Sequence, residues 1–99
     1  VIELHEAFAG QVLAVLEALQ SDTFAQEHLN KGSAVGTVDP ERINAWGGSL
    51  SLGHPFGATG TRLVTTAAHR LRVEDGQWAL VAACAAGGQG HALLIERRA

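Results

Sequence analysis

The sequence predicts one α/β domain in which helices pack against a mixed sheet. Two long stretches carry apolar residues at helical spacing, and Trp78 to Ala83 is a continuous apolar run. Such a run is typical of a strand buried on both faces. The predicted order is strand, helix, strand, helix, strand, strand, with the last two strands antiparallel. This alternation indicates a layered α/β fold.

Composition limits the classes of function. With 99 residues, 46% hydrophobic and 17% charged, the chain has the size and composition of one globular domain. The net charge of -3 gives no basic surface for nucleic acid. No apolar run reaches the roughly 20 residues that span a bilayer, and the first residues do not resemble a signal peptide. A single cysteine excludes an internal disulfide and fits a reduced, intracellular setting.

The N-terminal third predicts a strand followed by helices. Val1 to Leu4 is a short apolar strand, and Glu6 to Gln20 is an amphipathic helix. Ser21 is expected to cap a short helix that begins at Thr23, and Lys31 to Arg42 reads as a loop. Because the chain starts directly in a strand and contains no methionine, we expect a fragment of a longer protein. The apolar face of the first helix comprises Phe8, Val12, Val15, Leu16 and Leu19.

The remainder of the chain is rich in glycine and ends in two strands. The density of glycines from residue 43 to 60 indicates tight turns and close approach of the backbone. The predicted elements after it are a helix over Thr61–Arg72, a turn at Asp75-Gly76, a strand over Trp78–Ala83, a glycine-rich turn over Ala85–Gly90 and a strand over His91–Glu96.

His54 lies in the most unusual segment, Gly47 to Gly60. The glycine spacing resembles a phosphate loop, but His54-Pro55 stands where a lysine and a serine or threonine are needed, which excludes nucleotide binding. One interpretation is a structural turn before a helix that Thr59 helps to cap. The other is that the rigid turn presents the imidazole to a pocket, where histidine suits proton transfer near neutral pH.

Cys84 and His5 are the other candidates for chemistry. Cys84 ends the predicted buried strand, and the glycines that follow would let backbone N–H groups face an oxyanion. Taken alone, Cys84 fits a small buried hydrophobic residue at least as well. His5 lies between strand and helix, where the helix dipole would keep it neutral, although a capping or core role is equally compatible. The histidines and the cysteine show no zinc-site spacing.

Together the three segments resemble the thiolase superfamily. His5-Glu6-Ala7-Phe8 resembles its Asn-Glu-Ala-Phe box, Gly53-His54-Pro55 its Gly-His-Pro box, and the segment from Cys84 to Gly88 its Cys-x-Gly box. The resemblance covers residues 1–99 and is to the C-terminal half only. Histidine in place of asparagine is similar to the thiolase (beta) subunits of fatty-acid oxidation complexes. Ala86 departs from the usual glycine but keeps its backbone N–H.

The resemblance implies a thiolase-like fold and a role for each residue of the site. His54 would activate a nucleophilic cysteine, and His5 would help to form an oxyanion hole. Cys84 would be the general acid/base that exchanges protons with the α-carbon or with the thiol of coenzyme A. The remaining implied residues are Ala86 and Gly87 for a second oxyanion hole, and Gly53, Pro55 and Phe56 for substrate binding.

The implied activity is thiolysis of 3-ketoacyl-CoA, or the reverse Claisen condensation, in fatty-acid β-oxidation. Coenzyme A is a substrate, and no metal or cofactor is expected. The acyl-accepting cysteine of the family lies in the N-terminal half, so the chain alone is expected to be inactive. A homodimer, an α subunit of a β-oxidation complex as partner, and the cytoplasm rather than the mitochondrial matrix are also expected. The alternatives are a catalytically silent thiolase-like binding or scaffold module, and a sterol-carrier-type thiolase-like protein.

Overall fold

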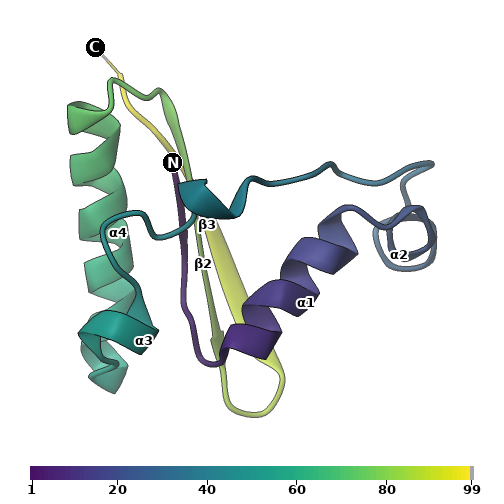
Figure 1. The fold of residues 1–99 in the computed structure, drawn as a ribbon, viewed down its shortest axis with the longest axis horizontal. Coiled ribbons are helices and arrows are strands. Elements are labelled where there is room, and N and C mark those ends of the chain that lie inside the picture. The colour runs from purple at the N-terminus through teal and green to yellow at the C-terminus, as the bar shows by residue number, and fades with distance from the viewer. Residues whose placement is uncertain (99) are drawn as a thin grey trace.

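A three-stranded mixed sheet forms the centre of the computed structural model, which describes residues 1–98 (Figure 1). The strands are β1 (Ile2–Leu4), β2 (Trp78–Ala85) and β3 (Gln89–Glu96), in that order across the sheet. β1 runs parallel to β2, and β2 runs antiparallel to β3. The predicted α/β class with a mixed sheet and a C-terminal hairpin is confirmed.

The helices lie on both sides of this sheet. In Figure 1 the longest helix runs alongside the strands on the left, and the two helices that follow β1 project to the right. Within the described residues, no helix is both long enough and apolar enough to cross a membrane. The helices are α1 (Ala9–Leu19), α2 (Asp22–His28), α3 (Ser49–Leu52) and α4 (Phe56–Val73), with a 3-10 turn at Pro40–Arg42.

The core lies between α4 and β2. Leu63, Ala67 and Leu71 recur every four residues and so share one face of α4. They pack against Ala79 and Val81, which alternate along β2 and therefore point to the same side of the sheet. Burial of each leucine contributes about 1.5–3 kcal/mol, so this contact is the main apolar stabilisation of the domain.

The prediction that β2 is buried on both faces is wrong. Trp78 is 48% exposed and Leu80 38%, whereas the alternate residues are buried. α4 packs on one face of β2 only. Trp78 and Leu80 lie on the opposite face and therefore point away from the core. A continuous apolar run cannot reveal which of its faces is covered.

The predicted strand between the two long helices is also absent, and a single bridge between Ile2 and Ile43 takes its place. Asn44 has a positive φ of 49°, which ends the extended conformation directly after this bridge. Its side chain then pairs with β1 as a backbone would: Leu4 N–H donates to Asn44 Oδ1 at 2.8 Å, and Asn44 Nδ2 donates to Leu4 O at 2.8 Å.

The two long helices are present as predicted, but each begins at a different residue. α1 begins at Ala9 and not at Glu6, because Phe8 is still extended (φ -149°, ψ 145°). α4 begins at Phe56, ahead of the predicted Thr61, so Thr59 lies inside the helix and does not cap it. The predicted cap of the short helix is confirmed, since Phe24 N–H donates to Ser21 Oγ at 3.1 Å.

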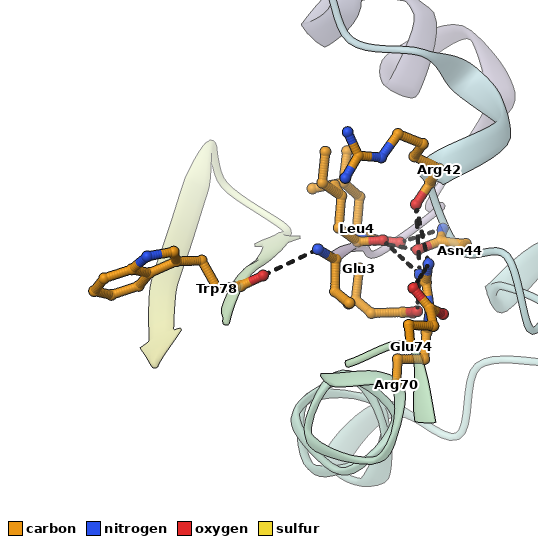
Figure 2. A network of polar contacts seen from close by, with 9 residues as sticks. Glu3, Leu4, Arg42, Asn44, Arg70, Glu74 and Trp78 are labelled. Atoms are coloured by element: carbon orange, nitrogen blue, oxygen red, sulfur yellow. Dashed lines mark hydrogen bonds and ion pairs between the residues drawn. The ribbon is translucent and has the colours of Figure 1, made fainter. Parts of the chain in front are cut away.

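A buried ion pair ties β1 to α4 (Figure 2). Arg70 Nη1 lies 2.8 Å from Glu3 Oε1, and the two side chains are 3% and 0% exposed. Arg70 also donates to Glu74 Oε1 at 2.6 Å and to the backbone oxygen of Ile2 at 3.2 Å. Burial raises the pKa of the Glu3 carboxyl, and the hydrogen bond from Arg70 opposes that rise. The network fixes the position of β1, and therefore of the residue that follows it.

Candidate active site

His5 extends β1 into the site. Its backbone N–H donates to Ala82 O at 2.8 Å and so continues the parallel pairing beyond Leu4. The side chain is only 4% exposed, and Nδ1 lies 2.8 Å from Ser49 Oγ at the start of α3. Two elements that are 44 residues apart in sequence therefore fix the orientation of this imidazole.

His54 lies in the turn between α3 and α4. Gly53 before it has a φ of 104°, a backbone conformation that favours glycine. The exposed imidazole contacts α4 through Nδ1, which lies 2.6 Å from Thr59 Oγ1. Its ring stands 4.2 Å from the ring of His5, centroid to centroid, at an angle of 41°. The ring of Phe56 also lies edge-on to that of His54, with their centroids 5.2 Å apart.

Cys84 is exposed and lies one residue before the end of β2, opposite Gly90 of β3. The hairpin that follows needs positive φ at Gly87 (86°) and Gly88 (73°). Such values are strained for residues with a side chain, which accounts for the glycine pair. The alternative interpretation of Cys84 as a small buried hydrophobic residue is therefore wrong, and the prediction that it sits at a strand end is confirmed.

A pocket of about 770 Å³ brings the three boxes together. Among the predicted residues it includes all three candidates for catalysis, as well as Phe56 and Ala86, whereas Gly53, Pro55 and Gly87 are not part of its lining. Sequence reasoning did not select Gln11, because a single glutamine on an amphipathic helix gives no signal. The lining residues are His5, Ala7, Phe8, Gln11, His54, Phe56, Cys84, Ala85 and Ala86.

Burial lowers the pKa of His5, and the nearby positive groups His54 and Arg62 lower it further, against an opposing effect of Glu6. A lowered pKa agrees with the expected neutral imidazole, but the cause differs from the helix dipole. α1 begins only at Ala9, four residues after His5. The largest cause of the lowered pKa is instead the desolvation of the imidazole by burial. The site thus presents a neutral histidine beside a second, solvent-exposed histidine.

The pocket offers acid/base chemistry and hydrogen-bond donors. Cys84 and His54 place a thiol and an imidazole in the pocket, and both are groups that serve as general acids and bases in enzymes. A neutral imidazole at His5 and the backbone N–H of Ala86 can donate to an oxygen that becomes negative. Within residues 1–98, no three histidine, cysteine, aspartate or glutamate residues are grouped closely enough to hold a metal ion.

Comparisons with known proteins agree with these features. The chain is 64% identical over 96 residues to the mitochondrial trifunctional enzyme subunit beta of Bos taurus, which covers 97% of the chain and 20% of that relative. It is 59% identical over 96 residues to a probable 3-ketoacyl-CoA thiolase of Caenorhabditis elegans, covering 97% and 21%. The chain therefore spans about a fifth of the length of these relatives.

A solved structure has a similar fold. The structure of human mitochondrial 3-ketoacyl-CoA thiolase in complex with CoA superimposes with a TM-score of 0.79 and 35% identity, covering 100% of this chain and 21% of the other. The family model described as "Thiolase, C-terminal domain" matches residues 1–97. With nearly the whole chain matched to the model of the family's C-terminal domain, the conclusion is that this protein belongs to the thiolase family.

Proposed function

We propose that this domain supplies the acid/base and oxyanion-binding groups of a 3-ketoacyl-CoA thiolase, an acyltransferase that acts in fatty-acid β-oxidation. One observation carries the proposal: His5, His54 and Cys84 come from three separate segments and line one pocket. The identity of 64% to a trifunctional enzyme subunit beta supports the β-oxidation assignment.

The proposed chemistry gives each group a defined role. Thiolysis cleaves the carbon–carbon bond beside a ketone, so a thiolate must attack and the departing carbanion needs a proton. Cys84 takes the proton of the coenzyme A thiol and delivers one to the α-carbon. His5 donates to the oxygen that becomes negative, and Ala86 N–H donates to a second one. His54 activates the cysteine that accepts the acyl group.

That acyl-accepting cysteine has to lie outside the 99 residues. Cys84 is the only cysteine in the sequence, and its place in the Cys-x-Gly box gives it the acid/base role. We therefore propose that the domain acts together with a further thiolase segment that supplies the nucleophile. The isolated 99-residue chain should not catalyse thiolysis.

Substrate, partners and location follow from the relatives. One solved relative is a complex with CoA, which supports coenzyme A and its acyl thioesters as substrates. The name of the cattle relative supports association with a further subunit of a β-oxidation complex, and a homodimer is proposed for the thiolase itself. The expected preference for the cytoplasm has no support from these relatives. The cattle relative carries a mitochondrial name, so a mitochondrial location is the better-supported proposal.

Substitution of Cys84 in the full-length protein tests this function. Cys84→Ser should lower kcat for 3-ketoacyl-CoA thiolysis by roughly 10²–10⁴-fold, the usual contribution of an acid/base group. Acylation of the nucleophilic cysteine by acetyl-CoA, followed by mass spectrometry, should persist. This pattern separates the acid/base role from the nucleophilic one.

A matched pair of histidine variants provides the control. His54→Asn removes an imidazole that lines the pocket, whereas His69→Asn removes an exposed imidazole of α4 that does not line it. Only the first should lose activity. Thiolysis near the wild-type rate in Cys84→Ser would overturn the proposal. A wild-type protein that binds acyl-CoA without cleaving it would instead identify a silent thiolase-like binding module.

A further inference from the structure

A short relay of polar side chains reaches His5 from the side of α4. Arg62 of α4 donates from Nη2 to Ser49 Oγ at 3.1 Å, and Ser49 Oγ lies 2.8 Å from His5 Nδ1. Ser49 opens α3 and is 6% exposed. The three residues come from α4, α3 and the end of β1, so the relay exists only in the folded domain.

The donors and acceptors along this relay can be assigned. A guanidinium group has only N–H donors, so Ser49 Oγ must accept from Arg62. The hydroxyl then has its own hydrogen to donate, and His5 Nδ1 lies at hydrogen-bond distance. If Nδ1 accepts this hydrogen, the neutral imidazole carries its proton on Nε2.

The opposite tautomer is less favourable. With the proton on Nδ1, both His5 and Arg62 would donate to Ser49 Oγ, and no other acceptor for the Ser49 hydroxyl is found among residues 1–98. A buried hydroxyl without a partner costs about 1–3 kcal/mol. This cost decides between the two tautomers, because it equals a factor of roughly 5 to 150 in their ratio.

The positive groups around His5 also favour its neutral form. The titratable and charged groups that affect it are His54, Arg62 and Glu6. Burial lowers the pKa of His5 most, followed by the positive charges of His54 and Arg62. Arg62 Nε and Nη1 are buried and have no hydrogen-bond partner within the described residues, and no carboxylate there lies at ion-pair distance from this guanidinium.

We propose that Ser49 and Arg62 are positioning residues that hold His5 as the neutral tautomer with its proton on Nε2. Nε2 is the ring nitrogen away from Ser49, and no described residue hydrogen-bonds to it. In the reaction of the proposed function, on which this use rests, Nε2–H is the donor to the developing oxyanion. The wrong tautomer would turn a lone pair toward that oxygen and repel it.

Neutron diffraction from crystals of the full-length protein tests the proton arrangement directly. Deuterium is expected on His5 Nε2 and on Ser49 Oγ directed at His5 Nδ1. Deuterium on Nδ1, or on both ring nitrogens at neutral pH, would overturn the proposal. This result does not depend on catalysis, so it stands even if the protein does not catalyse thiolysis.

Kinetics of Ser49 variants in the full-length protein test the use of that proton. Ser49→Ala should lower kcat by roughly tenfold to a hundredfold, as other losses of an orienting hydrogen bond do, with KM unchanged because the donor acts in the transition state. Ser49→Thr restores the hydroxyl and should recover most of kcat.

Ser51→Ala is the matched control. Ser51 lies on the same helix and its hydroxyl bonds only to the backbone of Gly48, at 3.1 and 3.2 Å. This variant should keep the wild-type kcat. Equal losses in Ser49→Ala and Ser51→Ala, or an unchanged kcat in Ser49→Ala, would contradict the positioning role. Absence of thiolysis in the wild type would refute the proposed function alone, and the neutron map would still decide the tautomer.

Discussion

Two arginines of α4 differ in what they contact: Arg70 bonds to β1, and Arg62 bonds to Ser49 of α3. Arg62 and Arg70 are eight residues apart, slightly more than two helical turns, so they point to the same side. Arg70 bonds to Glu3, to Glu74 and to the backbone of Ile2, and Figure 2 shows how closely these groups surround it. Arg62 makes a single hydrogen bond, to Ser49, within the described residues.

The difference shows how one strand can carry structure at one residue and chemistry two residues later. At Glu3, the carboxylate is paired with Arg70, which holds β1 against α4, although Glu3 Oε2 is buried without a hydrogen-bond partner in residues 1–98. Near His5, Nε and Nη1 of the Arg62 guanidinium have no hydrogen-bond partner in residues 1–98, and neither does Nε2 of the imidazole. Incomplete pairing stabilises the fold less, but it leaves a donor for a ligand.

The largest expected effect is on stability, at the Arg70 position. Arg70→Met leaves Glu3 buried and unpaired, which should cost about 3–5 kcal/mol. Hydrogen-exchange mass spectrometry of the full-length protein should show faster exchange in β1 and α4, with kcat per folded molecule retained. A fall in kcat without faster exchange would contradict the division between the two positions.

A somewhat smaller effect, on activity, is expected at the His5 position. His5→Leu roughly keeps the volume of the side chain but leaves the buried Ser49 hydroxyl without an acceptor. The loss of stability should therefore be about 1–3 kcal/mol, less than that expected for Arg70→Met. Loss of an oxyanion donor should lower kcat for thiolysis by roughly 10²–10³-fold, or about 2.7–4 kcal/mol. Arg70 is assigned to stability and His5 to activity. Unfolding of His5→Leu but not of Arg70→Met would contradict this assignment.

The smallest effect is expected at Glu74 and depends on pH. The hydrogen bond from Arg70 lowers the pKa of Glu74, so the ionised carboxylate stabilises the fold above the ordinary glutamate pKa of about 4.3. This contribution is lost as the pH falls through that value toward the lower pKa of the folded state. Because the side chain is 38% exposed, it amounts to about 1 kcal/mol at most.

Melting curves of Glu74→Gln and wild type check this sign. The variant should melt at a lower temperature at pH 7, and the difference should shrink as the pH falls below about 4. Its kcat at pH 7 should equal that of wild type. A difference that grows in acid would show that Glu74 is not the stabilising ion that the Arg70 contact implies.

Local pattern predicted most of the elements, and its errors arose where contacts distant in sequence decide the structure. The hairpin and both long helices were found because apolar spacing and glycine turns are properties of neighbouring residues. The strand expected between the helices was wrong because Asn44 leaves the extended conformation and pairs through its side chain. The face of β2 that lies open could not be predicted, because exposure depends on what packs there.

The candidate site divides in the same way. Residue type and motif order singled out His5, His54 and Cys84, which is all that the sequence by itself determined about the chemistry. Only the tertiary structure decided that the three line one pocket, that burial lowers the pKa of His5, and that Ser49, which accepts from Arg62, lies beside its ring. The physical reason is that desolvation and hydrogen-bond partnership arise between elements more than forty residues apart, whose contacts form only when the chain folds.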